Sequence, residues 1–224
     1  MTFSNRRLVL FSAVAAAVAA LASFAVAPQG VSAAYAGDSV VSIHQMGGDI
    51  NVDSAPQGAE LSTMGGAIHV GSASFINAKT MGGDISIDRA TGPVDASTMG
   101  GKVTIRQVAG AVHASTMSGD VTVHLIGASG SERDVKLSSM AGTILLTVPK
   151  DFGMDVRIKL TYTKNSPRNF RIIQHLGLTE RESTDWDTHN GTPRKYVLAQ
   201  GRVGDGKNHV TIDTINGDVV LKQE

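Results

Sequence analysis

The sequence predicts an all-β fold: a parallel β-helix, or β-solenoid, with coils of about 18 residues and a less regular C-terminal insertion or cap. Three observations lead to this prediction. A Met-Gly turn motif recurs at an almost constant interval, and each turn is followed by branched apolar residues that alternate with polar ones. Aromatic residues make up only 4% of the chain whereas 25 of its 224 residues are Gly, which suits a thin solenoid interior.

The overall composition excludes several classes of protein. The chain has no Cys, which rules out a disulfide-stapled mini-protein and a Cys-ligated zinc or iron–sulfur site. Lys and Arg together number 20, as do Asp and Glu, so bulk positive charge cannot drive binding to nucleic acid. We expect no cofactor and no nucleic-acid partner.

The N-terminal residues 1–36 have the order of a secretory signal. Arg6 and Arg7 precede an uncharged, Ala-rich stretch from Leu8 to Ala27, and small residues at Ala34 and Ala36 form a cleavage site. An uncleaved N-terminal anchor is the alternative, because the apolar stretch is long enough to span a bilayer. The sequence thus predicts a protein exported to the periplasm, cell surface or extracellular space, with residues 37–224 forming a single β-solenoid domain.

The repeat itself is marked by two residue types. Met recurs at positions 46, 64, 81, 99 and 117, at intervals of 18, 17, 18 and 18 residues. The structural column of methionines comprises Met46, Met64, Met81, Met99, Met117 and Met140. The second residue after each Met position is Gly, namely Gly48, Gly66, Gly83, Gly101, Gly119, Gly142 and Gly217. A position that is Gly in all seven units needs either positive φ or a close approach between coils.

Two strands flank each turn. Downstream, positions such as Ile85 and Ile87 predict a short strand with one buried face. Upstream, Val94, Ala96 and Thr98 alternate with polar residues and predict a second strand that also has one buried face. The residues expected to face outward are Asp95, Ser97, His113 and Ser115. Such coils must stack to bury their apolar faces, and seven of them at about 4.8 Å would form a rod about 34 Å long.

The C-terminal third departs from the repeat. A strand-like stretch covers 153–160, and residues 161–206 are predicted to be an irregular insertion or cap, since the ends of a solenoid need covering. Residues 209–221 then restore the repeat. Within the insertion, Asp185, Trp186 and Asp187 form a candidate partner contact; the alternative is that Trp186 packs the cap onto the last coil.

These motifs resemble a known family. The GGDI and NGDV turns, the export signal and the closing TIDTINGDVVL are similar to the bacterial adhesin-like family of β-strand-repeat proteins, a domain of unknown function. The resemblance covers nearly all of residues 37–224. It implies a parallel β-helix-like fold in the cell envelope and offers no established catalytic residues.

The Met and Thr columns each have two interpretations. Met can fill the corner of the core, which we favour because its flexible side chain suits irregular gaps, or it can form an exposed interaction stripe. The column of Thr63, Thr80, Thr98 and Thr116 can bind ice or a glycan, or, as is commoner, hydrogen-bond beside its own turn.

The third residue after each Met carries charge at several coils. The column reads Asp49, Ala67, Asp84, Lys102, Asp120, Thr143 and Asp218. A calcium-binding β-roll is one interpretation, but vertical alternation of charge fits better because like charges on adjacent strands repel. Asp88 and Arg106 are predicted to pair across coils. The seven His residues fall at different repeat phases, so we expect no metal site.

The function expected from these features is that of an exported, non-enzymatic scaffold or adhesion module of the bacterial envelope. Its expected partners are an envelope protein or a surface glycan, or a second copy of the chain, with membrane contact only through an uncleaved N-terminal segment. One alternative is a regulatory or sensory partner in an envelope-stress system. A carbohydrate-active enzyme is the third class, for which Asp84, Asp95 and Asp120 would supply carboxylates and Arg106 a cation.

Overall fold

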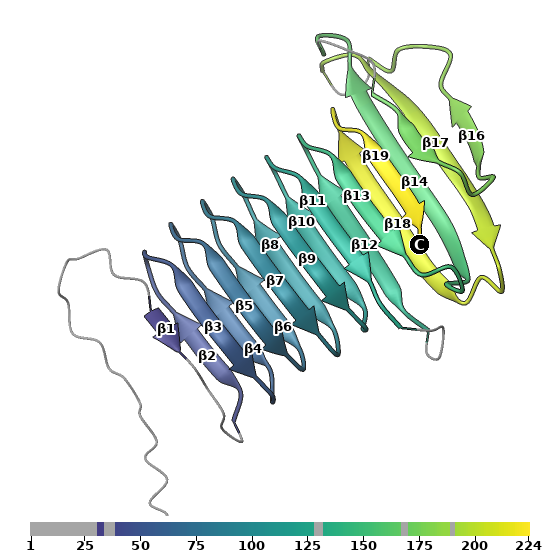
Figure 1. Ribbon diagram of the computed structural model, residues 1–224. Coiled ribbons are helices and arrows are strands. Elements are labelled where there is room, and N and C mark those ends of the chain that lie inside the picture. Colours follow the sequence, from purple (N-terminus) through teal and green to yellow (C-terminus); the bar gives the residue numbers. More distant parts are fainter. Residues whose placement is uncertain (1–30, 34–38, 128–131, 167–169, 189–190) are drawn as a thin grey trace, which may run out of the picture.

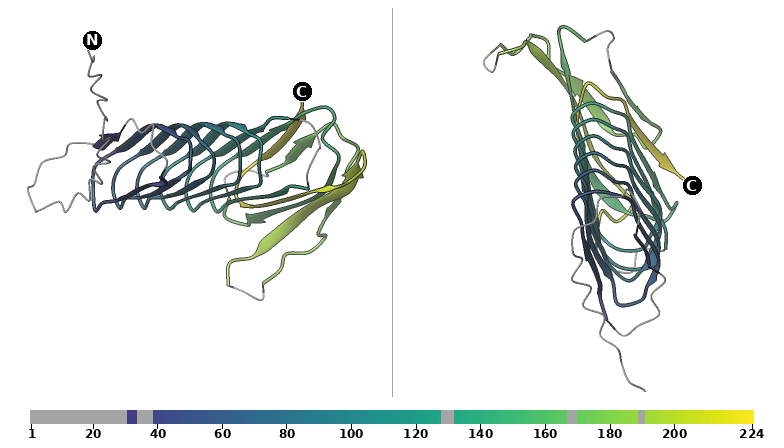
Figure 2. Two further views of the ribbon diagram at one scale, coloured as in Figure 1. Left: turned by 90° about the horizontal axis from the view of Figure 1, so that it is seen from below. Right: turned by 90° about the vertical axis from the view of Figure 1, so that its left-hand side faces the viewer.

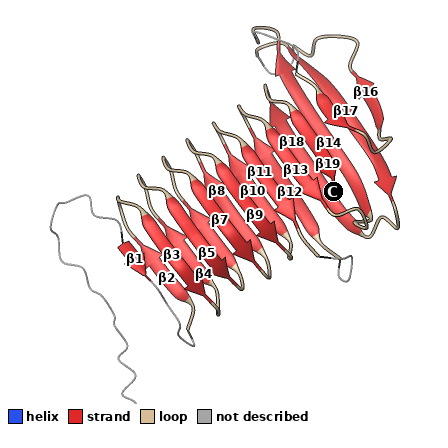
Figure 3. Ribbon diagram, in the orientation of Figure 1, coloured by secondary structure: helices blue, strands red, loops and turns tan. Residues whose placement is uncertain are grey.

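The computed structural model describes residues 31–33, 39–127, 132–166, 170–188 and 191–224. Within these ranges the chain is all-β and contains no helix (Figure 3). The strands form two sheets, one of nine strands and one of ten, and the chain alternates between them along most of its length. Figure 1 shows the resulting elongated stack, and the view along the stack in Figure 2 shows its flattened two-layer cross-section. This arrangement has the character of a β-solenoid.

The nine-stranded sheet contains the strands that follow the Met-Gly turns. Its members, in spatial order, are β1 (Val31–Ala33), β3 (Ile50–Ala55), β5 (Ile68–Ala73), β7 (Ile85–Ala90), β9 (Val103–Val108), β11 (Val121–Leu125), β13 (Ile144–Val148), β19 (Val219–Gln223) and β15 (Ile172–Gln174). All of its strand pairs are parallel. Identical positions of successive repeats therefore lie side by side in this sheet.

The ten-stranded sheet contains the strands that precede the turns. From the N-terminal end its order is β2 (Val41–His44), β4 (Ala59–Ser62), β6 (Ile76–Lys79), β8 (Val94–Thr98), β10 (Val112–Thr116), β12 (Asp134–Ser139), β18 (Asn208–Ile215), β14 (Met154–Thr163), β17 (Arg194–Val203) and β16 (Thr179–Glu182). Pairing is parallel as far as β14, whereas β17 is antiparallel to both β14 and β16.

The register follows the repeat period read from the sequence. Val94 pairs with Ile76 on one side and with Val112 on the other. Val112 then pairs with Val135, because more residues separate β11 from β12 than separate the earlier strands. A coil consists here of one strand from each sheet with its turns, and coils with these offsets lie directly over one another.

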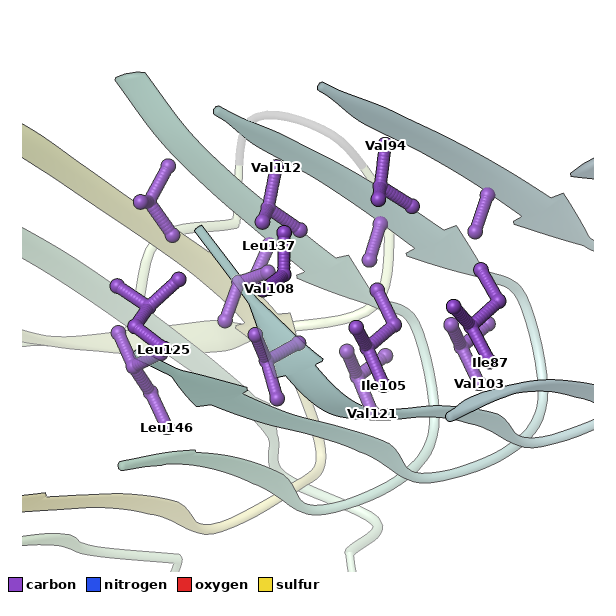
Figure 4. Packing of buried hydrophobic residues seen from close by; sticks show 14 of the residues in the cluster. Ile87, Val94, Val103, Ile105, Val108, Val112, Val121, Leu125, Leu137 and Leu146 are labelled. Atoms are coloured by element: carbon purple, nitrogen blue, oxygen red, sulfur yellow. The ribbon is translucent and has the colours of Figure 1, made fainter. Parts of the chain in front are cut away.

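The core lies between the two sheets and is made of small and branched apolar side chains. Val94, Ala96 and Thr98 are buried, as are Ile85 and Ile87, so the predicted inward faces are confirmed. Asp95 and His113 are exposed, and Ser97 and Ser115 are partly exposed. Figure 4 shows Val, Ile and Leu side chains from both sheets meeting in this interior. The spacing of the sheets leaves little room for rings, which explains the scarcity of aromatic residues.

The last repeat does not lie at the end of the stack. Strand β18 pairs with β12 on one side and with β14 on the other, while β19 lies between β13 and β15. The chain therefore leaves the space of one coil after β13, builds β14 to β17, and returns to fill that space with β18 and β19. Figure 1 shows the yellow C-terminal strands inside the stack.

The segment 161–206, which was expected to be an irregular insertion or cap, contains more regular structure than its sequence indicates. It contains the end of β14 and all of β15, β16 and β17, and β14 and β17 form a long antiparallel pair that runs from Met154↔Val203 to Thr163↔Arg194. The alternating pattern is hidden here because β16 is exposed at every position and most positions of β17 are only partly buried. Since neither strand has a fully buried face, hydrophobic periodicity could not reveal them.

A buried polar cluster joins the last repeat to its neighbours. Asn208 is fully buried; its side chain accepts a hydrogen bond from the Arg133 backbone N–H (3.0 Å) and donates one to the Gly153 carbonyl (2.6 Å). The Arg133 guanidinium donates to the Ile126 carbonyl and lies over the Phe152 ring. Burial lowers the pKa of Arg133 from its ordinary value. These bonds hold the start of β18 between β12 and β14.

The predicted export signal, 1–36, lies outside the described residues except for 31–33. Those three residues form β1, which pairs with β3 at the N-terminal end of the stack. In the part of the chain that the structure describes, no helix is both long and apolar enough to cross a membrane.

Candidate functional site

The Met-Gly corner is the most regular surface feature of the stack. At the corner formed by residues 98–101, Thr98 and Gly101 are buried, whereas Met99 and Gly100 are exposed. The prediction that Met fills the corner of the core was therefore wrong. The inward positions of the corner are occupied by the Thr side chain and by the second Gly, and the Met side chain lies outside them. The exposed column members are Met46, Met64, Met81, Met99, Met117 and Met140.

The Thr column is buried and acts as a hydrogen-bond ladder. Thr98 donates its hydroxyl proton to the Gly83 carbonyl of the preceding coil (2.9 Å) and accepts from the Gly101 N–H (3.2 Å). The same donation to a Gly carbonyl is made by Thr63, Thr80, Thr116, Ser139 and Thr214. The interpretation of a ladder beside its own turn is confirmed. An ice- or glycan-binding role for these hydroxyls is excluded, because they face the interior.

The Gly column is explained by close approach of the coils. A Cβ added at Gly101 would lie well under 3.0 Å from the Gly83 carbonyl oxygen, a separation that real side chains do not adopt. The same clash with the preceding Gly carbonyl arises at Gly66, Gly83, Gly119, Gly142 and Gly217. Within the column, only Gly48 has positive φ. The Gly83 carbonyl oxygen that leaves no room for a Cβ at Gly101 is also the acceptor for the Thr98 hydroxyl. The Thr and Gly columns therefore contact the same carbonyl groups.

The acidic column caps backbone N–H groups of the next coil. Asp49, Asp84 and Asp120 each accept a hydrogen bond from the backbone N–H one coil further along, at residues 67, 102 and 143. Asp218 does the same for Arg171, which precedes β15. In spatial order the column reads Asp49, Ala67, Asp84, Lys102, Asp120, Thr143, Asp218 and Arg171, so Asp occupies every second coil. Lys102 also pairs with Asp120 at 3.3 Å.

A second charge pair crosses the coils on the outer face of the nine-stranded sheet. The predicted pair of Asp88 and Arg106 is confirmed, and His69 lies 3.7 Å from the same carboxylate. These side chains are substantially exposed, so the pair stabilises the stack only weakly. Among the described residues, no three His, Cys, Asp or Glu side chains come together in a metal-binding arrangement.

The segment predicted to contact a partner, residues 185–187, packs partly against the C-terminal strands. The ring of Trp186 meets the ring of Tyr162 edge to face, with centroids 5.8 Å apart, and the Lys195 ammonium lies over it. Asp187 accepts a hydrogen bond from the Tyr196 hydroxyl (2.9 Å), whereas Asp185 is exposed. This geometry favours the packing role of Trp186, since the half-buried ring and Asp187 both hold the segment onto the sheet.

Two tyrosines and the hollow beside them were missed by the sequence reasoning. The Tyr162 hydroxyl on β14 hydrogen-bonds Glu182 on β16, crossing over β17. Burial, followed by this bond and the nearby negative charge, raises the pKa of Tyr162 to about 12. A hollow of about 450 Å³ is lined by Lys159, Arg181, Glu182, Ser183, Tyr196 and Leu198. The scarcity of aromatic residues elsewhere was the one sequence signal that could have drawn attention to this end of the molecule.

Comparisons with protein-family models, with curated proteins and with solved structures give no match for this chain.

Proposed function

We propose that this protein is an exported, non-catalytic scaffold or adhesion module of the bacterial cell envelope that acts through extended surface contacts. The observation that carries the proposal is the parallel register, which repeats from coil to coil. It aligns outward side chains such as Asp95, His113 and Lys136 in one row, in which neighbouring members are about 4.8 Å apart. Rows of this kind suit a long ligand, either a surface glycan or another envelope protein, because many weak contacts add up along them.

The length of the coils and the C-terminal cap are part of the same proposal. Pairing offsets such as Val94↔Val112 support a coil of about 18 residues. Strands β14 to β17 lie beyond β18 and β19 and cover that end of the stack as a cap. The N-terminal end would then be left for self-association. The resemblance to the bacterial adhesin-like family of β-strand-repeat proteins supports the assignment to the envelope.

A regulatory partner in an envelope-stress system is the second candidate. The hollow between β14, β16 and β17 favours it, because the exposed Leu198 adjoins Lys159 and Tyr196 there. An apolar residue beside a cation and a phenol suits one defined protein partner better than a repetitive polymer.

Crosslinking in producing cells, followed by recovery of the tagged full-length protein, tests both candidates. The comparison uses a stack variant, Asp95→Arg with His113→Glu on β8 and β10, and a hollow variant, Leu198→Arg on β17; all three altered residues are exposed. Loss of the crosslinked species in the stack variant alone is the result expected of a scaffold or adhesion module. Loss in the hollow variant alone, with a single membrane protein as partner, would overturn that proposal and support the regulatory one.

A further inference from the structure

The exposed methionines form a continuous column along one corner of the stack. Met64, Met81, Met99, Met117 and Met140 are each 46–50% exposed, and Met46 at the end of the column is 78% exposed. By contrast, Met154 on β14 is fully buried in the core. Six long apolar side chains thus face solvent at equivalent positions, although hydrophobic burial ordinarily favours polar residues there.

The fold does not need sulfur at this corner. The inward positions are filled by Thr and Gly, and the coils are joined there by hydrogen bonds of Thr hydroxyls and Asp carboxylates. In the last repeat Ile215 occupies the Met position, and its coil keeps the same Thr and Gly contacts through Thr214 and Gly217. A side chain without sulfur is therefore accepted by the coil, so packing does not explain the Met column.

Backbone hydrogen bonds place the methionines of adjacent coils next to one another. The carbonyl oxygens of Met64, Met81 and Met99 accept hydrogen bonds from the N–H groups of Gly82, Gly100 and Ser118, each of which directly follows the next Met. Neighbouring coils are then separated by the ordinary strand spacing of about 4.8 Å. A zinc–thiolate bond is about 2.3 Å long, and two metal–sulfur bonds of similar length span nearly this backbone spacing. The flexible Met side chains of adjacent coils can therefore place two sulfurs on one ion.

We propose that the Met column binds soft monovalent metal ions, Cu(I) in particular, between the thioether sulfurs of adjacent coils. Thioethers are soft, neutral ligands and select Cu(I) over hard divalent cations. The first Gly of each turn, at Gly82 and Gly100, places no side chain beside the sulfurs, and an added Cβ would meet nothing closer than 3.6 Å at these two positions. Six methionines provide three separate pairs, so the full column holds at most three ions.

Titration of the full-length protein with Ag(I), a redox-stable ion with the same charge and ligand preference, tests this site. Native mass spectrometry counts the bound ions, and NMR of ¹³C-methyl-labelled Met shows which sulfurs respond. The expected result is up to three ions per chain, with shifts of the column methyl groups and none of the buried Met154 methyl group. Absence of binding, or shifts confined to other residues, would overturn the proposal.

Leu variants separate thioether binding from binding elsewhere. A triple change of Met81, Met99 and Met117 to Leu leaves one adjacent pair, Met46 with Met64, so the maximum number of ions should fall from three to one. The single variant Met99→Leu should lower it from three to two, and it serves if the triple variant does not fold. The control Met154→Leu should keep all three ions. An unchanged number of ions in the folded column variants would assign them to His rings or carboxylates and contradict the proposal.

Discussion

At the scale of single residues, each of the four positions of the Thr-Met-Gly-Gly turn has a different environment. Thr points inward and hydrogen-bonds the coil below, Met points outward, the first Gly is open and the second Gly contacts the backbone of the preceding coil. The two glycines look equivalent in the sequence, but only the second faces a carbonyl oxygen. Consistent with this, the first Gly position is Ser118 and Ala141 in later repeats, whereas the second remains Gly.

Alanine substitution should distinguish the two glycines. Gly101→Ala forces the coils apart, because its Cβ would overlap the Gly83 carbonyl, and we expect a loss of about 1–3 kcal/mol, as for overpacked cores. Gly100→Ala is the matched control: its Cβ would meet the Met81 carbonyl oxygen at 3.6 Å, an ordinary contact, and we expect a change within about 0.5 kcal/mol. Urea unfolding measures both. Equal destabilisation by the two variants would contradict the close-approach explanation.

At the scale of elements, the antiparallel strands at the C-terminal end are tied together by side chains that cross between strands. Tyr162 reaches from β14 over β17 to Glu182 on the edge strand β16. Tyr196 on β17 holds Asp187, and Trp186 packs against Tyr162. These contacts stabilise an edge whose residues are otherwise exposed.

The raised pKa of Tyr162 predicts a loss of stability at alkaline pH. Below pH 10 the phenol is neutral in both folded and unfolded chains. Between about pH 10 and the folded-state pKa of about 12, the unfolded chain releases the proton first, so this contribution to stability is lost as the pH rises. Tyr162→Phe should therefore lose less stability than the wild type over this range. Parallel losses in the two proteins, measured by urea unfolding from pH 9 to 12, would contradict the assignment.

At the scale of the whole molecule, the order of coils in space differs from their order in the chain. The last repeat fills a gap between β12 and β14, although β13 to β17 separate it from β12 along the chain, as the pairing Val135↔Val210 illustrates. In this spatial order Asp218 lies between Thr143 and Arg171, so the alternation of Asp along the acidic column continues to the end of the stack. Because β12 and β18 are far apart along the chain, we expect their pairing to form more slowly than that of coils adjacent in sequence.

Truncation should reveal this dependence. Removal of residues 208–224 takes away β18 and β19 and leaves both β12 and β14 without a partner on that side, so we expect loss of cooperative unfolding and exposure of apolar surface. Deletion of residues 41–58 removes β2 and β3 and leaves only β1 without any partner, so it should lower the melting temperature while unfolding stays cooperative. Calorimetry and binding of a hydrophobic dye compare the two. Cooperative unfolding of the C-terminal truncation would contradict the inserted position of the last repeat.

The sequence by itself determined the all-β, parallel-rich architecture, because a side-chain period of two and a repeat of constant length report directly on strands and their register. The inward faces at Val94 and Ile85 and the pair of Asp88 with Arg106 followed from that register. Only the tertiary structure decided which way Met99 points, that Gly101 rather than Gly100 is in close contact, and that β18 and β19 lie inside the stack. These features depend on contacts between coils at a corner or across long chain separations, where no local periodicity carries the information.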